Sequence, residues 1–237
     1  MVTLPIFESL LAKKWLFRFD PSIQFQLSHP KTMPFARRTW IKAAGLILLT
    51  PASAAMAVMK LTPRQSEGPF YPVNFPVDSD ADLIWVDGKS RPATGTIVHL
   101  TGQVVNVNGE PISGAKVEIW QCDAFGAYKH PADRGDVSEP EFQGYGATGT
   151  SARGEFRFRT IRPVRYSGRT PHIHAKITPP GSRTVTTQFF VEGEAGNASD
   201  FLYRRIPEDR RALVTARYPA SPEQSDTVIP NYTVVVA

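Results

Sequence analysis

Hydrophobic and polar residues alternate along most of the chain beyond residue 97, in short runs separated by Gly, Pro and Asn. Because successive side chains of a β-strand point to opposite faces of a sheet, this alternation predicts strands with one buried face. The predicted strands are 99–107, 115–121, 154–159, 172–177, 184–191 and 232–236. Only residues 207–217 have a helical pattern. We therefore expect an all-β chain, a β-sandwich of two mainly antiparallel sheets with long functional loops and few short helices.

Turn chemistry and composition add two expectations about the organisation of the chain. Asn108-Gly109 separates the first two predicted strands, and an Asn-Gly pair between alternating runs is a strong hairpin signal. The stretch 61–93 is rich in Pro and Asp and shows little periodicity. We expect residues 58–97 to form an extended arm around a sandwich domain of residues 98–237.

The first 57 residues have the layout of an N-terminal extension followed by a signal peptide. Between Met33 and Ala57, basic residues precede an apolar stretch at 43–50, and small residues follow it. The pair Arg37-Arg38 resembles a twin-arginine export signal, whose route carries folded and often metal-loaded proteins. Export to the periplasm or the cell exterior is expected, with a start at Met1 or Met33 and cleavage after Ala55 or Ala57. A buried apolar helix is the alternative, and the stretch is too short for a stable membrane span.

The positive charge of the chain belongs mostly to this leader. The formal net charge is +5, and residues 1–57 hold seven basic and two acidic side chains. The remaining 20 basic and 20 acidic residues balance. The mature chain therefore offers no electrostatic reason to bind nucleic acid.

The cysteine content limits how the folded chain can be stabilised and which kinds of metal site it can form. Cys122 is the single cysteine, which excludes an intrachain disulfide and a multi-thiolate zinc site. Its neighbours have a strand pattern, so a small buried hydrophobe is expected rather than a nucleophile.

Two histidines one residue apart are the first candidate for chemistry. His172 and His174 project from the same face of a predicted strand, and Ile173 projects from the other. A pair of neutral imidazoles on one strand is a common way to bind a transition metal. Structural histidines that bond to the backbone are the alternative.

Two tyrosines in neighbouring loops extend the candidate site. Tyr128 follows the predicted strand 115–121, and Tyr166 precedes the histidine pair. A trivalent cation would deprotonate a phenol whose pKa is ordinarily about 10. Two phenolates and two imidazoles would suit Fe(III), whereas loop tyrosines that serve only packing are the simpler alternative.

Six stretches of the chain, in order, resemble the intradiol ring-cleaving dioxygenases, most closely protocatechuate 3,4-dioxygenase β-chain-like members. They begin with EGPFYP at 67–72, LTGQVVNVNGEPISGAKVEIWQ at 100–121 and DAFGAY at 123–128. GEFRFRTIRP at 154–163, GRTPHIH at 168–174 and TQFFVEG at 187–193 follow. The resemblance covers roughly residues 61–235.

The resemblance implies a mononuclear non-haem Fe(III) and a ring-opening reaction. Tyr128 and His174 would be equatorial ligands, and Tyr166 and His172 axial ones. The substrates would be a small-molecule catechol and O2, and the product a cis,cis-muconate-type diacid. In that family Tyr166 would leave the metal as substrate binds, Arg169 would stabilise charge on the substrate, and Gln188 would line the pocket.

Departures from the family pattern leave the substrate and assembly open. Ser167 stands where a proline is usual, and Ala147, Ser151 and Arg153 replace residues that are often charged differently. His130 and His99 are interpreted as rim or structural residues. The sequence is compatible with a homo-oligomer and does not say which catechol is used.

A second class of protein also fits part of the chain. VVNVNGEPISGAKVEIW, residues 104–120, resembles a transthyretin-like β-sandwich module that binds or spaces without catalysis. Such a module has no need of the two tyrosines and two histidines together.

Overall fold

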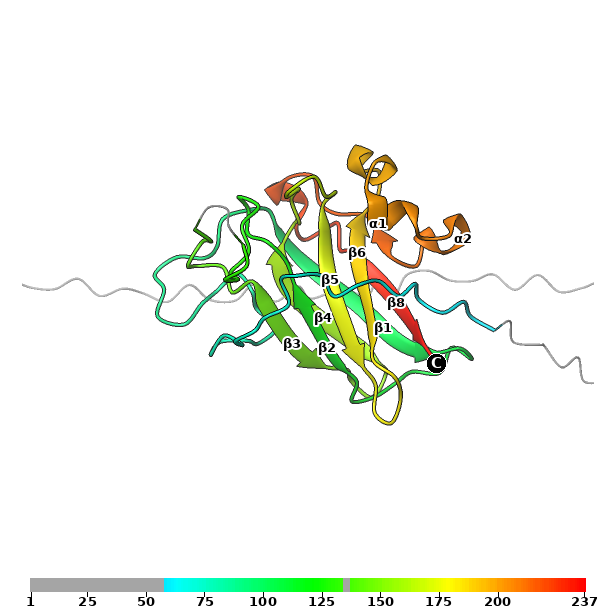
Figure 1. Ribbon diagram of the computed structural model, residues 1–237. Coiled ribbons are helices and arrows are strands. Elements are labelled where there is room, and N and C mark those ends of the chain that lie inside the picture. The colour runs from blue at the N-terminus through cyan, green and yellow to red at the C-terminus, as the bar shows by residue number, and fades with distance from the viewer. Residues whose placement is uncertain (1–57, 134–136) are drawn as a thin grey trace, which may run out of the picture. The chain divides into compact units, whose positions relative to one another are not determined.

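The computed structural model describes residues 58–133 and 137–237. The expected N-terminal extension and twin-arginine-type signal peptide, residues 1–57, lie outside these ranges. Within the described residues, the strands form two packed sheets, as predicted from the alternation (Figure 1). The three-stranded sheet has the order β4-β1-β8: Glu155–Ile161, Ile97–Asn106 and Asn231–Val236. The five-stranded sheet has the order β3-β2-β5-β6-β7: Tyr145–Gly149, Lys116–Trp120, His172–Thr178, Val185–Val191 and Thr215–Ala216.

Antiparallel pairing dominates both sheets, and two pairings are parallel. β1 runs parallel to β8, with Val104 beside Val234, and β6 runs parallel to β7. The other pairings are antiparallel, which agrees with the expected mainly antiparallel sandwich.

The predicted hairpin between the first two strands is wrong. The turn at Asn108-Gly109 forms, because Asn106 N–H donates to Glu110 O and Ile112 N–H donates to Val104 O. Pairing then stops, and β1 and β2 belong to different sheets. The turn therefore begins a crossover between the layers, which lets both strands bury an apolar face against each other across the core.

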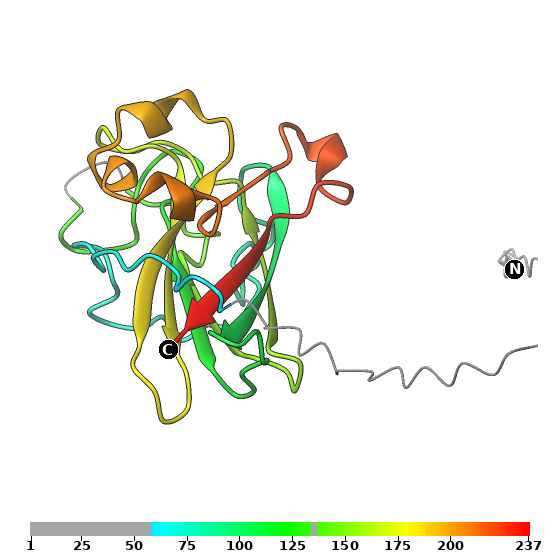
Figure 2. The ribbon, with the colours of Figure 1, turned by 90° about the vertical axis from the view of Figure 1, so that its right-hand side faces the viewer.

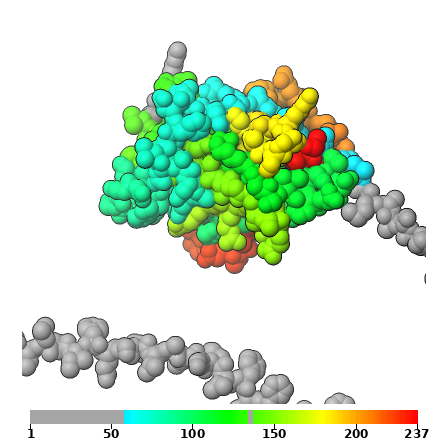
Figure 3. Space-filling model, turned by 90° about the horizontal axis from the view of Figure 1, so that it is seen from below, coloured from blue at the N-terminus to red at the C-terminus, as the bar shows by residue number. Residues whose placement is uncertain are grey.

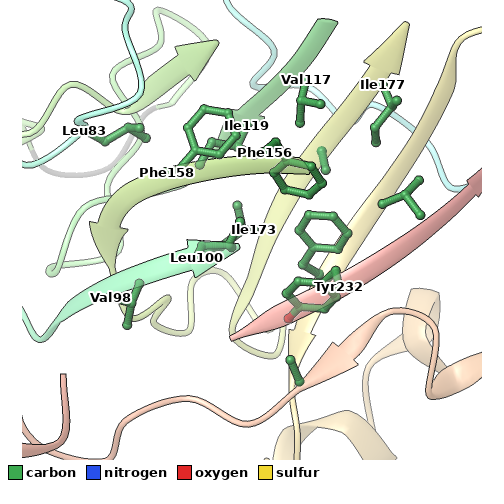
Figure 4. Close-up of a cluster of buried hydrophobic side chains, with 14 of the residues drawn as sticks. Leu83, Val98, Leu100, Val117, Ile119, Phe156, Phe158, Ile173, Ile177 and Tyr232 are labelled. Atoms are coloured by element: carbon green, nitrogen blue, oxygen red, sulfur yellow. The ribbon is translucent and has the colours of Figure 1, made fainter. Parts of the chain in front are cut away.

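The core lies between the two sheets and is apolar. β1 and β4 contribute Leu100 and Phe158 from one layer, and β5 contributes Ile173 from the other, all fully buried (Figure 4). Tyr232 reaches in from β8, stacks on Phe189 and donates its hydroxyl hydrogen to Phe190 O.

The arm before β1 has no helix or strand and lies along the sandwich. Met59 N–H donates to Val107 O, and Gln65 N–H donates to Thr186 O of β6. Figure 1 shows this cyan segment crossing β5 and β6. Further along, Leu83 and Ile84 are fully buried and complete the core. The first part of the arm thus covers the outer face of the five-stranded sheet, and its later part packs into the core.

Two strands of the structure, β3 and β7, were not predicted from the sequence. β3 is short and contains Gly146 and Gly149, so it lacks an apolar pattern. A side chain at Gly146 would lie 2.6 Å from Leu83 Cδ1, so the glycine permits the arm to pack here. β7 is only two residues long, Thr215–Ala216.

The helix predicted at 207–217 is much shorter than expected. The structure has α2 at Glu208–Arg211, and the chain then turns into β7. A second short helix, α1 at Phe201–Arg204, was not predicted; its N-cap is Asp200. Two 3₁₀ turns, Ala195–Ala198 and Pro222–Gln224, complete the helical elements of the described residues.

The helices gather at one end of the sandwich, beyond the end of β6 (Figure 2). The turn between β5 and β6 lies at the opposite end, where Figure 3 shows it in yellow. None of the described helices has the length and apolar character needed to cross a bilayer.

Gly102 in β1 is a position where the core has no room for a side chain. A Cβ atom there would lie 2.6 Å from Tyr232 O and would overlap the Phe156 ring. We expect Gly102→Ala to lower the free energy of unfolding by about 1–3 kcal/mol, measured by denaturant titration, because backbone and ring must move. Gly149→Ala is the matched control, since nothing lies within 4 Å of its Cβ position. Equal stability of the two variants would contradict this packing.

Candidate metal centre

The outer face of the five-stranded sheet carries the candidate site. Along β5, Ile173 enters the apolar core, whereas His172 and His174 point to the opposite face. Trp120 of β2 and Gln188 of β6 lie directly beside His174 in register. These two histidines, Trp120 and Gln188 are each at most 1% exposed, because the arm and the loops cover this face.

The structure brings the four side chains of the predicted ligand set together. His172 Nε2 and His174 Nε2 are 3.2 Å apart. The Tyr166 ring lies 5.4 Å from the His172 ring and 5.0 Å from the Tyr128 ring, between centroids. The Tyr128 and His174 rings are 6.3 Å apart. Two imidazoles and two phenols therefore surround one small volume.

The orientation of the His172 ring follows from a backbone contact. Its Nδ1 lies 2.7 Å from Thr170 O, a carbonyl that can only accept, so Nδ1 carries the hydrogen. Nε2 then presents a lone pair toward His174 Nε2. In the metal-free protein His174 donates across this gap, and with a cation between them both nitrogens would act as ligands.

Burial and positive charge keep both imidazoles neutral. Burial, together with the nearby Arg169 guanidinium, lowers the pKa of His172 to about 4. Burial, with His172 and Arg169 nearby, holds the pKa of His174 well below its usual value. Trp120 stacks on the His174 ring at 4.9 Å, and Gly68 of the arm leaves room for that ring. Neutral nitrogen lone pairs are therefore available at neutral pH.

The loop that carries Tyr128 is held by two carboxylates. Asp123 accepts from Phe125 N–H and Ala127 N–H, and Asp133 accepts from Tyr128 N–H. The Phe70 ring from the arm stacks on Tyr128 at 4.4 Å. Backbone and ring are thus fixed, and the hydroxyl oxygen is buried without a hydrogen-bond partner.

Tyr166 lies at one end of a tight turn. Arg169 N–H donates to Tyr166 O, and the two central residues, Ser167 and Gly168, have φ of 40° and 77°. Positive φ at both central positions is typical of a type I′ turn. Proline, fixed near −65°, cannot occupy the Ser167 position in this turn, which accounts for the departure from the family pattern.

Arg169 is held by a buried ion pair. Its Nε donates to Asp200 Oδ2 at 2.7 Å, and its Nη2 donates to Gln188 Oε1 at 2.7 Å. Asp200 also accepts from Thr170 N–H and from two backbone N–H groups of α1. The pKa of the Asp200 carboxyl is lowered despite its burial, because these donors stabilise the charged form. One carboxylate thereby fixes the arginine, the start of β5 and α1.

Several residues of the site were not identified from the sequence. Asp200 follows the N-cap pattern, an aspartate just before a short apolar run, and could have been recognised as a cap. Trp120, Phe70 and Gly68 lie within the family motifs, but their contacts with the ligand set depend on the path of the arm. No local pattern reveals that path.

Among the residues interpreted as non-ligands, Cys122 packs beside Tyr128, whereas His99 and His130 have other partners. Cys122 is buried, as expected, and burial raises the pKa of its thiol to about 12. His99 lies on β1, with its Nε2 3.8 Å from Asp226. His130 Nδ1 accepts from Ala132 N–H, and its ring lies edge-on to Phe70.

The donor set suits a hard, highly charged cation. In the described residues, no group of three His, Cys, Asp or Glu side chains could hold a metal ion, so the phenols are needed to complete a site. Burial raises the pKa of both Tyr128 and Tyr166, so both are protonated in the metal-free protein. A trivalent ion repays this cost by replacing two phenolic protons, and the buried Tyr128 hydroxyl then gains the partner it lacks.

A cavity of about 740 Å³ opens beside this centre. Tyr166, His174, Arg169 and Gln188 line its inner part. Residues of the arm form one wall, and residues 201–210 form the other. A small molecule in the cavity could therefore reach the metal centre and the arginine at once.

Comparisons with known proteins identify the family of the chain. A family model described as dioxygenase matches residues 66–233. The chain is 34% identical over 176 residues to the protocatechuate 3,4-dioxygenase α chain of Burkholderia cepacia, covering 70% of this chain and 88% of that one. The β chain of the same enzyme is 32% identical over 173 residues, with 69% and 73% covered. The chain belongs to the intradiol ring-cleaving dioxygenase family.

Two further comparisons delimit this similarity. Catechol 1,2-dioxygenase 1 of Acinetobacter lwoffii is 30% identical over 175 residues, which are 66% of this chain and 55% of that enzyme. The chain thus spans about half the length of that relative. The solved dioxygenase domain of a dioxygenase–carbohydrate-binding fusion from Streptomyces sp. SirexAA-E has 29% identity and a TM-score of 0.58, covering 75% of this chain and 98% of that domain.

Acid should destabilise the metal-free protein through its buried histidines. The unfolded chain takes up protons on histidine below about pH 6.5, whereas folded His172 does so only near pH 4. The unfolded state therefore binds more protons in this window, and stability falls as the pH falls through it. We expect His172 alone to account for a loss of about 3 kcal/mol between pH 7 and pH 4, measured by denaturant unfolding.

The difference between two variants isolates this contribution from that of the carboxylates. His172→Gln should show a shallower pH dependence than the original protein, and His99→Gln, at a half-exposed position outside the site, is the matched control. Identical slopes for His172→Gln and the original chain would contradict the assignment of a buried neutral imidazole.

Proposed function

We propose that this chain is an exported intradiol dioxygenase with a mononuclear Fe(III) held by Tyr128, Tyr166, His172 and His174. It would open a catechol-type ring between its two hydroxyl-bearing carbons with O2 and release a cis,cis-muconate-type diacid. Both oxygen atoms of O2 end in the product, so no other reductant is needed. The observation that carries the proposal is the buried, unpartnered Tyr128 hydroxyl beside two neutral imidazoles and a second phenol.

A ferric ion in this position would supply an electron-accepting centre at which a chelated catechol becomes reactive toward O2. The chain's own contribution begins with the two phenols, which differ in exposure. Tyr128 is 4% exposed and does not line the cavity, whereas Tyr166 is half-buried and lines it. As a phenolate on the metal, Tyr166 Oη would therefore be placed to take a proton from an incoming catechol.

Arg169 and Gln188 form the polar wall of the inner cavity. The Arg169 guanidinium is pre-oriented by Asp200, so it offers a fixed positive charge where negative charge develops on the substrate oxygen. Gln188 Oε1 accepts from Arg169, which leaves its Nε2 hydrogens, buried and unpartnered, available as donors. Apolar residues of the arm, including Phe70 and Pro69, limit the access of water.

The alternative, a transthyretin-like binding module, would explain the sandwich and the turn at 108–109. It gives no reason for burying two phenols and two imidazoles around an unpartnered oxygen, which costs stability. The family match over 66–233 also supports the enzyme. Export through the twin-arginine-type signal at Arg37-Arg38 is part of the proposal, with the enzyme acting in the periplasm or outside the cell.

Oxygen uptake tests the proposed reaction directly. Iron-loaded protein should consume one O2 for each ring opened when it is given catechol, 3,4-dihydroxybenzoate or a substituted catechol, with the diacid followed by absorbance.

Tyr128→Phe should lose the visible phenolate-to-iron band and the activity, because the most deeply buried anionic donor is gone. Its metal-free form should be as stable as the original or more so by about 1–3 kcal/mol, since a buried unpartnered hydroxyl is removed.

Tyr218→Phe is the matched control for that variant. Tyr218 is buried outside the site, and its hydroxyl is bonded to the Tyr232 hydroxyl. This variant should keep the band and lose about 1 kcal/mol of stability. Iron retention and an unchanged band in Tyr128→Phe would refute the ligand set, and absence of ring opening with every catechol would refute the reaction.

Arg169→Ala tests the role of the fixed positive charge. We expect turnover to fall by about 10²–10³-fold, by analogy with the loss of one transition-state donor, while the catechol-induced change of the visible band under anaerobic conditions persists. Arg159→Gln is the control, because Arg159 forms a surface ion pair with Asp82. Full turnover in Arg169→Ala would remove its catalytic role, and circular dichroism would report any loss of fold from the unpaired Asp200.

A further inference from the structure

We propose that the outer part of the cavity is an anion subsite, in which Arg205 and Arg210 bind a carboxylate carried on a side chain of the catechol substrate. The inference rests on the proposed function and names the substrate class of that site. The acidic group would sit away from the ring, beyond Phe201, while the ring lies at the inner end beside Tyr166 and His174.

The charge of the cavity wall is the first observation. Four arginines line the cavity, and none of its lining residues in the described part of the chain is acidic: Arg64, Arg169, Arg205 and Arg210. Two of them are already engaged. Arg169 pairs with Asp200, and Arg64 donates to the backbone oxygen of Thr184.

Arg205 and Arg210 are the two that remain available. Both are exposed, and no ion pair joins either of them to a carboxylate in the residues that the structure describes. The acidic neighbours in sequence have other partners, since Glu208 pairs with Arg211 and Asp209 pairs with Lys60. Arg210 is close enough to Asp209 to attract its charge, but no salt bridge joins them. Two exposed guanidinium groups on one wall favour an anion between or beside them.

Phe201 connects this outer wall to the metal centre. The guanidinium carbon of Arg169 lies 5.4 Å from the Phe201 ring centroid, and that of Arg205 lies 5.9 Å from the same centroid. Phe201 is 57% exposed although it lines the cavity, so a ligand can contact its ring close to both cations. A substrate that touches Arg169 with its ring oxygen can therefore extend past Phe201 to Arg205.

The size of the cavity agrees with a substrate longer than a single ring. Its volume of about 740 Å³ lies within the range of about 300–1,000 Å³ that holds drug-sized ligands. A bare catechol would leave the outer wall and both arginines without contact. The geometry points to a catechol whose carboxylate is separated from the ring by a short chain.

Three pairs of compounds test this subsite: 3-(3,4-dihydroxyphenyl)propanoate, 3,4-dihydroxybenzoate and 3-(4-methoxyphenyl)propanoate, each with its neutral methyl ester. Iron-loaded protein should prefer the propanoate to its ester in kcat/KM by about tenfold or more, the worth of one charge-assisted hydrogen bond. The preference should shrink as salt rises, because these exposed charges are screened. The double variant Arg205→Gln, Arg210→Gln should abolish the preference. Arg204→Gln, which removes one positive charge from α1 outside the cavity lining, should keep it.

Calorimetric titration of metal-free protein with the methoxyphenyl pair separates the subsite from the reaction, since this ring has no paired hydroxyls and cannot be opened. The acid should bind more tightly than its ester in the original protein and in Arg204→Gln, and equally to its ester in the double variant. If no catechol is cleaved but this difference holds, the proposed reaction fails and the anion subsite stands. Equal binding of acid and ester, no detectable binding of the acid, or a preference confined to 3,4-dihydroxybenzoate and unaffected by the double variant would overturn the subsite.

Discussion

Both faces of β5 are buried, and the rest of the site depends on this constraint. Strand alternation sends Ile173 into the sandwich core and His172 and His174 to the outer face. A shift of pairing by one residue would exchange the two sets and place imidazoles in an apolar core, at a cost of several kcal/mol for unpaired polar groups. The apolar core therefore fixes the register of the strand, and the register fixes the positions of His172 and His174.

Covering the outer face requires chain that is not part of either sheet. The arm brings Gly68 and Phe70 over His174 and Tyr128, and buried carboxylates hold the loops between them. Asp123 organises the loop before Tyr128, and Asp200 links Arg169 to α1. Each of these carboxylates accepts several hydrogen bonds, so its burial is compensated and its loop is rigid. The positions of the site residues therefore depend on these two buried carboxylates, which accept hydrogen bonds, and not on the sheet alone.

The sequence predicts what alternation and local motifs encode, and it fails where distant segments meet. Six of the strands follow from period-two patterns, and the shared face of His172 and His174 follows from the same rule. The prediction of a hairpin at 108–109 was wrong because the turn signal is local. Burial of apolar side chains across the core decides which sheet each flanking strand joins. The helix at 207–217 shrank for a related reason, since Val214 packs beside Phe190 and the chain pairs with β6 as β7. Trp120 against His174 and Asp200 against Arg169 join residues far apart in sequence, and no local pattern encodes such contacts.

The unpartnered polar atoms of the candidate site indicate how a bound metal ion would affect the stability of the fold. Tyr128 Oη, His174 Nδ1 and Gln188 Nε2 are buried without partners, whereas most buried polar atoms in proteins are satisfied. Each costs about 1–3 kcal/mol in the metal-free fold, so the sandwich core must supply that stability in advance. A ligand that binds only the folded chain returns part of it by mass action. The same fold therefore keeps the imidazoles neutral and the phenols protonated, and a highly charged cation that replaced the phenolic protons would stabilise it.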